Sequence, residues 1–362
     1  MKTQDSNTNT MVCIKKSTYQ TIDLDSLLCP LGGLNKYVKK GQRILLKVSL
    51  LNASVPSKAV VTDPALVKKT AEAVLKEGGI PYIGDSPSGQ FTKRRLKKVY
   101  EKAGLTDISR ELGIELNYDT TTKKVPIPKG NRLKKTPICN FILQADKIIA
   151  LPKIKTHAYM IMTLAAKIMY GAVPGLTKAK YHSMYIRRTS FSDLLLDILL
   201  VAKPDLIIMD GIIGMQGQGP ASGTPVNLGV LLAAEDPISM DIAVCRMLNI
   251  EPVGIPVLKR AKLRVLWPKE IVYPQLTPED VKYSGFILPS TADYLLTGKK
   301  TPEQSPIVTT KCNSCGYCEE ICPKNAITML AKGAKIYYPK CIKCYCCHEV
   351  CPEEAIELGV LK

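Results

Sequence analysis

The stretch CNSCGYCEEICP occupies residues 312–323, and a second stretch of the same design, CIKCYCCHEVCP, occupies residues 341–352. Nine of the thirteen cysteines of the chain fall within its last 51 residues. Equivalent cysteines of the two stretches are 29 residues apart, and PKNAI after the first matches PEEAI after the second. The C-terminal segment is therefore an internal repeat, and its two copies predict one small pseudo-symmetric module.

The cysteine spacing within each copy is C-x2-C-x2-C-x3-C-P, which occurs in bacterial ferredoxins that carry two [4Fe-4S] clusters. Three cysteines in one tight loop can bind three irons of a cube, whereas the fourth cysteine of the run reaches the neighbouring cube. The spacing therefore predicts two [4Fe-4S] clusters as cofactors. The first would be held by Cys312, Cys315, Cys318 and Cys351, and the second by Cys341, Cys344, Cys347 and Cys322.

Structural zinc is the alternative to iron and sulfur, because zinc also binds paired cysteines. Zinc sites usually take two ligands from each of two separated knuckles, and the runs here have three close cysteines, a fourth and a proline. The spacing therefore favours clusters over zinc. Cys346 lies outside the pattern, and we expect it to be a bystander and not a ligand.

Length and composition bound the class of protein. A chain of 362 residues predicts two or three folding units. The net charge of +18 comes largely from scattered lysines, and with 6% aromatic residues a solvated basic surface is favoured over a nucleic-acid interface. No apolar run is long enough to span a membrane, and the N-terminus does not look like a secretion signal. We expect a cytoplasmic protein, where clustered thiols stay reduced.

The body of the chain alternates between strand and helix patterns. A strand at 41–50, a helix at 62–79 and a strand at 80–89 form one unit, in which Asp63 caps the helix. Further strands are predicted at 145–152, 205–211 and 226–235, and further helices at 158–171, 190–203 and 236–248. Residues 153–157 are predicted to be a basic loop, and Ser190 with Asp193 resembles a capping box. Alternation of this kind predicts an α/β fold with a mostly parallel sheet and flanking helices.

The predicted domain organisation has four parts. Residues 1–10 form a disordered tail, 11–264 the α/β body, 265–310 a linker or wrapping segment, and 311–362 a small α+β ferredoxin-like domain with two clusters.

Three stretches of the body resemble a known family. VTDPALVKKTAEAVLKEGGIPYIGDSPSG (61–89), LPKIKTHAYMIMTLAAKIMYGAVPG (151–175) and the segment 209–248, which begins MDGIIGMQGQGPASG, are similar to domain-of-unknown-function family 362. Its members are often described as uncharacterised iron-sulfur-centre proteins. The resemblance covers most of residues 40–255, and it implies no reaction, because the family's own name supplies none.

Candidate catalytic residues follow three predicted strands directly. Asp85, the stretch from Lys153 to His157, and Asp210 would meet at the carboxyl edge of a parallel sheet, where such folds bind ligands. Lys153 and Lys155 could neutralise a carboxylate or phosphate, His157 could transfer a proton, and Asp85 or Asp210 could orient it. For each of these residues taken alone, a solvated loop residue is the favoured alternative.

Two further features of the body bear on a binding site. Lys167 lies in an otherwise apolar segment, where a cation needs an ion-pair partner or a function. His182, near Lys178, is a weaker member of the same basic group. The segment GIIGMQGQGPASG (211–223) is either a mobile active-site loop or a plain connection, and Gly214, Gly217 and Gly219 are its candidate cofactor-binding residues.

These patterns leave three classes of function. The first is an iron-sulfur oxidoreductase that passes low-potential electrons to a small anionic substrate or cofactor at the sheet edge. The second is an electron carrier whose body only docks a partner enzyme, and the third is a non-redox enzyme with a structural or sensing cluster domain. The first two require a redox partner protein, and exposed clusters predict an anaerobic or low-oxygen host.

Overall fold

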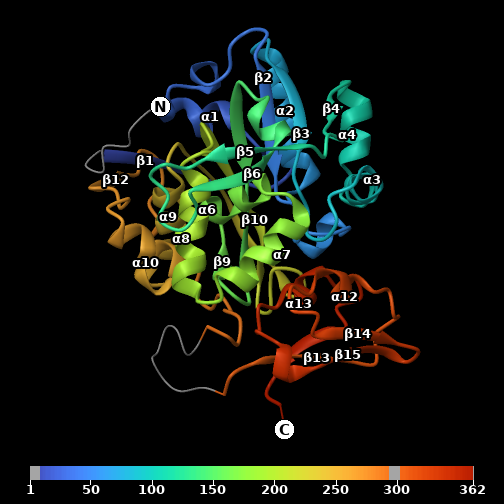
Figure 1. Cartoon of the computed structure of the whole chain (residues 1–362). Helices are drawn as coiled ribbons and strands as arrows, with labels where there is room; N and C mark the ends of the chain where they lie inside the picture. Colours follow the sequence, from blue (N-terminus) through green and yellow to red (C-terminus); the bar gives the residue numbers. More distant parts are fainter. Residues whose placement is uncertain (1–8, 293–301, 362) are drawn as a thin grey trace.

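The computed structural model describes residues 9–292 and 302–361, which form an α/β body and a small C-terminal domain below it (Figure 1). A ten-stranded sheet crosses the body. Its strands, in spatial order, are β12 (Glu270–Val272), β1 (Asn9–Lys16), β11 (Thr224–Ala234), β10 (Leu206–Gln216), β7 (Lys147–Leu151), β2 (Arg43–Val48), β3 (Ile80–Gly84) and β4 (Glu115–Leu116), with β8 (Lys153–His157) on β10 and β9 (Ile161–Thr163) on β8.

Most strand pairs of this sheet are parallel. β2 pairs in parallel with both β3 and β7, β10 pairs in parallel with β7 and β8, and β3 pairs in parallel with β4. The antiparallel pairs are β1–β11, β10–β11 and β8–β9. The structure therefore confirms the predicted α/β class with a mostly parallel sheet.

Helices cover both faces of the sheet. Successive side chains of β10 pack on opposite faces of the sheet. Leu206 and Ile208 belong to one hydrophobic core, and Ile207 and Met209 belong to the other. One face is covered by α1 (Leu24–Leu28), α2 (Pro64–Lys76), α3 (Lys93–Lys102) and α4 (Leu105–Leu112). The other face is covered by α5 (Asn140–Leu143), α6 (Ala165–Ile168), α8 (Arg188–Leu199), α9 (Pro237–Met247) and α10 (Pro256–Leu263). Both faces are apolar, as expected of a parallel sheet.

Helix caps agree with the sequence at two helices and disagree at a third. Asp63 accepts a hydrogen bond from the Ala65 amide at the start of α2, and Asp236 caps α9 in the same way. The capping box at Ser190 was wrong, because α8 already begins at Arg188. The side chain of Asp193 is instead buried and accepts two hydrogen bonds from Arg260.

The segment 153–171 differs from its prediction. Residues 153–157 are strand β8 and not a loop, and the predicted helix at 158–171 contains β9, the four-residue helix α6 and the 3-10 turn Met169–Ala172. Almost every residue of this segment is buried. A segment that is apolar on all sides has no period by which strand and helix can be separated, so its sequence misleads.

The glycine-rich segment 211–223 begins as strand and ends as a turn. β10 continues to Gln216, and only residues 217–223 form the turn into β11. A Cβ on Gly211 would lie 2.8 Å from the Ile154 side chain, and one on Gly214 would lie 2.9 Å from the Ile154 carbonyl oxygen. These glycines allow neighbouring strands to approach closely.

The C-terminal domain contains two small antiparallel sheets and two short helices. The sheets pair β13 (Ser305–Val308) with β16 (Ile356–Gly359), and β14 (Ile327–Leu330) with β15 (Gly333–Ile336). The helices are α12 (Tyr317–Ile321) and α13 (Cys346–Val350), whose bounds are 29 residues apart. This domain has the α+β composition that the sequence predicts.

The remaining described strands form the hairpin of β5 (Thr122–Pro126) with β6 (Lys135–Cys139), and the remaining described α-helix is α7 (Gly175–Met184). Residues 1–8 of the predicted tail and 293–301 of the predicted linker lie outside the described residues. Within the described residues, no helix has the length and apolar character needed to cross a membrane.

Candidate functional site

The cysteines of the C-terminal domain line two separate cavities. One cavity is lined by Cys312, Cys315, Cys318 and Cys351, and we call these four residues the first cage. The other is lined by Cys322, Cys341, Cys344 and Cys347, which we call the second cage. These sets are the same as those that the spacing predicts. Cys346 also lines the cavity of the second cage.

The backbone around the two cages repeats closely. Positive φ angles occur in pairs 29 residues apart: Ser314 (59°) with Lys343 (52°), and Gly316 (82°) with Tyr345 (61°). The amide of Ala326 donates a hydrogen bond to Cys322 Sγ at 3.2 Å, and the amide of Ala355 donates one to Cys351 Sγ at 3.3 Å. Residues other than glycine adopt positive φ only where the surrounding structure requires it. The two cages are therefore built by the same loop conformation.

The cages suit a cluster better than a single ion. A tetrahedral zinc ion needs its sulfur ligands about 2.3 Å from one centre. Within the described residues, no three His, Cys, Asp or Glu side chains are placed to share one metal ion. Four sulfurs around a hollow, with amide groups directed at some of them, match the donor set of a [4Fe-4S] cluster.

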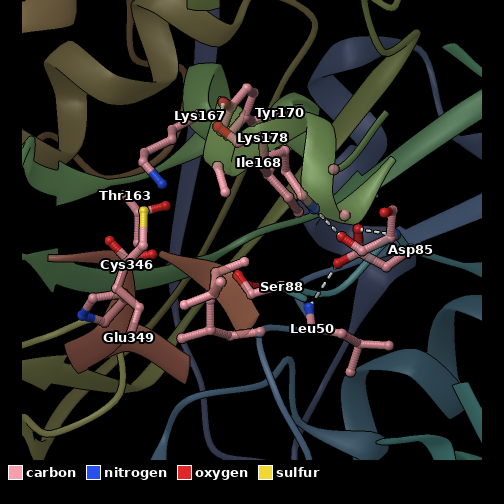
Figure 2. A pocket seen from close by; sticks show the side chains of 18 of the residues that line it. Leu50, Asp85, Ser88, Thr163, Lys167, Ile168, Tyr170, Lys178, Cys346 and Glu349 are labelled. Carbon is pink, nitrogen blue, oxygen red and sulfur yellow. Dashed lines mark hydrogen bonds between the residues drawn. The ribbon is translucent and has the colours of Figure 1, made fainter. Parts of the chain in front are cut away.

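A third cavity, of about 80 Å³, lies where the two domains meet (Figure 2). The loops after β2 and β3 contribute Ser49, Leu50, Leu51, Asp85, Ser86 and Ser88. Lys155 comes from β8, Thr163 from β9, Lys167 from α6, and Lys178 and His182 from α7. The C-terminal domain closes the cavity with Ile321, Cys346 and Glu349. The carboxyl ends of parallel strands therefore face the cysteine domain across this space.

Asp85 organises one side of the cavity, opposite Lys167 and Glu349 (Figure 2). Its carboxylate forms a 2.8 Å ion pair with the fully buried Lys47 and accepts hydrogen bonds from the amides of Leu50 and Ser86, each at 2.7 Å. A Cβ on Gly171 would lie 2.2 Å from Asp85 Oδ1, so glycine is required at this position. Asp85 is thus fully occupied by internal partners and positions the surrounding loops.

Three lysines bring positive charge to the cavity. Lys155 donates a 2.6 Å hydrogen bond to the Val60 carbonyl oxygen, and burial, followed by the charges of Lys167 and Lys153, lowers its pKa to about 7. Lys178 donates to the Ser86 carbonyl oxygen, and burial lowers its pKa to about 8.

Lys167 has no hydrogen-bond or ion-pair partner among the described residues, and its amine points into the cavity (Figure 2). Burial lowers the pKa of Lys167, while the Glu349 carboxyl opposes that shift. An anion entering the cavity would meet an amine that no protein group already holds.

His157 lies beside the cavity and faces Glu349. Its Nδ1 accepts hydrogen bonds from the amides of Tyr159 and Met160, at 3.1 and 3.4 Å, so the neutral ring carries its proton on Nε2. That nitrogen lies 3.2 Å from Glu349 Oε1 without forming a hydrogen bond. Burial, followed by the charge of Lys167, holds the pKa of His157 well below its ordinary range, and burial raises the pKa of Glu349 to about 7.

Other predicted site residues lie away from the cavity. Lys153 forms a 2.7 Å ion pair with Asp210, and both atoms are buried beside the hydroxyl of Tyr19. Neither residue lines the cavity, and neither do Gly214, Gly217 and Gly219. The structure therefore brings together Asp85, Lys155, Lys167 and the neighbouring His157, and separates Lys153 and Asp210 from them.

Sequence reasoning missed Glu349, Lys47 and the cavity-facing position of Cys346. Glu349 is the repeat partner of Glu320, which accepts a 3.1 Å hydrogen bond from the Gln90 amide of the body. Two glutamates at equivalent positions were a signal that both helices touch the body. Lys47 interrupts the apolar strand RILLKV, as Lys167 interrupts its own apolar segment.

The domain interface includes apolar and polar contacts. Ala179 of α7 packs with Ile321, Cys346 and Val350 of the C-terminal domain. His348 Nε2 lies 3.1 Å from the Gln218 carbonyl oxygen, and its Nδ1 lies 2.6 Å from that of Ile356. The second repeat therefore packs directly against the body.

Comparison with solved structures finds weak likenesses. The lactate racemase apoprotein from Thermoanaerobacterium thermosaccharolyticum aligns with a TM-score of 0.38 and 14% identity, over 66% of this chain and 57% of that one. A structural-genomics target from Thermotoga maritima aligns with a TM-score of 0.36 and 10% identity, over 69% and 59%. This chain thus spans less than two thirds of either, and scores this low carry no argument about chemistry.

Comparison with sequences is more informative. A thylakoid-associated protein of Synechocystis sp. is 32% identical over 275 residues, which cover 74% of this chain and 82% of that protein. The model of the family described as "Domain of unknown function (DUF362)" matches residues 44–246, and that described as "4Fe-4S binding domain" matches residues 306–328. The chain therefore belongs to the DUF362 family, and it is an iron-sulfur protein with a 4Fe-4S binding domain in its C-terminal part.

Proposed function

We propose that this protein carries two [4Fe-4S] clusters and transfers single electrons between them and a small anionic ligand in the interdomain cavity. One observation carries the proposal: Cys346 lines both the second cage and the cavity, so the two spaces share a wall. Its sequence neighbours on this wall include the cage ligand Cys347 and the cavity residue Glu349.

The repeated backbone supports a count of two. Both cages have the same loop conformation and an equivalent amide hydrogen bond to one cysteine sulfur, which supports the same kind of group in both. When bound, such clusters store and release single electrons at potentials set by hydrogen bonds and solvent exposure. The first cage is the more open of the two, because Cys315 is exposed. We infer that a redox partner protein exchanges electrons on that side.

The body supplies the chemistry of the ligand. Lys155, Lys167 and Lys178 attract an anion, and burial strengthens that attraction by excluding water. Asp85 fixes the loops after β2 and β3, while Glu349 and His157 provide two groups between which a proton could pass. The cavity thus offers charge neutralisation and a proton route beside the cage.

Anaerobic purification of the full chain tests this proposal. We expect about eight iron and eight sulfide per chain, and an EPR signal from the dithionite-reduced protein. A colourless protein that contains zinc would contradict the proposal. The double variant Lys155→Met and Lys178→Met tests the role of the cavity. If it keeps its clusters and their EPR signals do not change, the protein carries electrons without using the cavity.

A further inference from the structure

Three buried polar atoms that line the interdomain cavity have weak partners or none among the described residues: the Ser86 hydroxyl meets only the thiol of Cys139, and Glu349 Oε1 lies 3.2 Å from His157 Nε2 without a well-aligned hydrogen bond. They are Ser86 Oγ, His182 Nδ1 and Glu349 Oε1. The residues that carry them are 1%, 5% and 7% exposed. Native proteins leave few buried polar atoms unpaired, and those that remain call for a bound ligand or ordered water. The cavity is therefore built to satisfy a guest with several polar groups.

The positive charge of the lining determines the charge of that guest. Lys167 has no partner among the described residues, and Lys155 and Lys178 each donate only one hydrogen bond to a carbonyl oxygen. Asp85 is already neutralised by Lys47. An ammonium group has three donors, so these lysines retain capacity for an anion.

These polar atoms favour a guest that carries a hydrogen-bond donor as well as an anionic group. Glu349 Oε1 can pair with a hydroxyl group, which both donates and accepts hydrogen bonds. His182 is neutral, because burial lowers its pKa to about 3, and its ring stacks on Phe191 at 4.2 Å. A hydroxyl beside the anionic group can donate to such atoms or accept from them, whereas a carboxylate without a hydroxyl, such as acetate, can only accept.

Size limits the guest further. The cavity measures about 80 Å³. Roughly 15 Å³ of such space is enough for one water molecule, so the cavity has room for several waters or for one organic acid of a few heavy atoms.

We propose that the cavity binds a short 2-hydroxycarboxylate, whose carboxylate is held by Lys167 and Ser86 and whose hydroxyl meets Glu349. This inference rests on the proposed function, in that it names the class of the anionic ligand. Lys167 and Glu349 lie on the same side of the cavity (Figure 2), and the charge of each shifts the pKa of the other.

Calorimetric titration of the anaerobically prepared, cluster-loaded full chain tests the assignment, with glycolate, acetate and inorganic phosphate as probes. One added hydrogen bond is worth about 1 kcal/mol, so we expect glycolate to bind at least about fivefold more tightly than acetate. Ser86→Ala removes a single oxygen atom and should weaken glycolate binding by about the same factor. Lys180→Met is the matched control, because Lys180 is exposed on the same helix as Lys178. This variant should bind glycolate as tightly as the unmodified chain does.

Equal binding of glycolate and acetate, tighter binding of phosphate, or no binding of any probe would overturn the assignment. So would a Ser86→Ala variant that keeps its thermal melting profile and full glycolate affinity. A different result would contradict the proposed function alone. If the cluster-loaded chain binds glycolate but its EPR signals do not respond, the ligand class stands and the electron transfer between cluster and ligand does not.

Discussion

The two cysteine repeats, residues 312–323 and 341–352, share a backbone and differ in their surroundings. Both have positive φ angles at equivalent positions and an amide hydrogen bond to the sulfur of the last cysteine. Yet Cys315 of the first repeat is exposed, whereas the second repeat reaches the interdomain cavity through Cys346 and Glu349. Cysteine spacing fixes the cage, and the packing around it fixes what the cage can reach.

Glu320 and Glu349, at equivalent positions of the two repeats, differ in the same way. The side chain of Glu320 is 29% exposed and lies 3.9 Å from Arg95 at the edge of the interface. The side chain of Glu349 is 9% exposed and faces His157 and three lysines of the body. One glutamate serves docking, and the other belongs to the cavity.

Removal of one ligand from each cage should give the largest effect. Cys318 and Cys347 are equivalent and similarly buried, so Cys318→Ser and Cys347→Ser form a matched pair. Each variant should lose about four of eight irons. Only Cys347→Ser should abolish the response of the EPR spectrum to glycolate, and Cys346→Ser should keep all the iron. Iron counts and EPR on the three variants check this, and equal responses in the matched pair would erase the contrast.

Loss of the unpaired amine should have the next largest effect. Lys167→Met should weaken glycolate binding roughly 10-fold to 100-fold, because hydrogen bonds to charged groups are worth about 1.5–3 kcal/mol. The iron content should not change, since Lys167 touches no cage. Calorimetric titration of Lys167→Met and Lys180→Met with glycolate measures the effect. Unchanged affinity in Lys167→Met would show that Lys167 does not bind the ligand.

The free energy of unfolding should rise with pH because of the buried Lys155 in the cavity. Lys155 has an ordinary pKa of 10.5, and burial lowers it to about 7 in the folded chain, where Lys153, Lys167, Asp85 and Glu349 surround it. Between about pH 7 and 10.5 the unfolded chain therefore binds more protons than the folded chain, so the free energy of unfolding increases with pH in this window.

Across this window the free energy of unfolding should increase by a few kcal/mol, on the order of 1.4 kcal/mol per unit of pKa shift. Lys155→Met removes the titrating group and should flatten the slope. Anaerobic urea unfolding from pH 7 to 9 compares the two chains. Parallel curves for them would mean that Lys155 keeps its proton in the folded state.

The smallest effect is expected on the side of the first cage. Glu320→Gln weakens a contact at the interface edge, and pairs of this kind contribute at most about 1 kcal/mol. The apparent melting temperature should therefore fall only slightly, with glycolate affinity unchanged. A loss of glycolate binding in Glu320→Gln would show that the two repeats are not separated as described.

Local signals in the sequence predicted much of this molecule. The sheet class, the start of α2 at Asp63 and the two cysteine sets follow from short-range patterns, because each depends on neighbouring residues. β8 and β9 were missed, since a segment buried on every side carries no period.

The cavity could not be predicted in the same way, because its walls come from distant parts of the chain. Lys167 was suspected as an isolated cation, but Glu349 gained its meaning only when the second repeat docked on the body. Lys153 and Asp210 were expected in the site, and instead they neutralise one another at 2.7 Å. Sequence identified the charged residues and could not say which of them would pair.

The most direct test of the account is EPR of the dithionite-reduced full chain, recorded with and without glycolate and compared with Cys318→Ser and Cys347→Ser. We expect two cluster signals, of which only the one missing in Cys347→Ser changes when glycolate is added. A change in the other signal alone, or no iron-sulfur signal at all, would contradict this expectation.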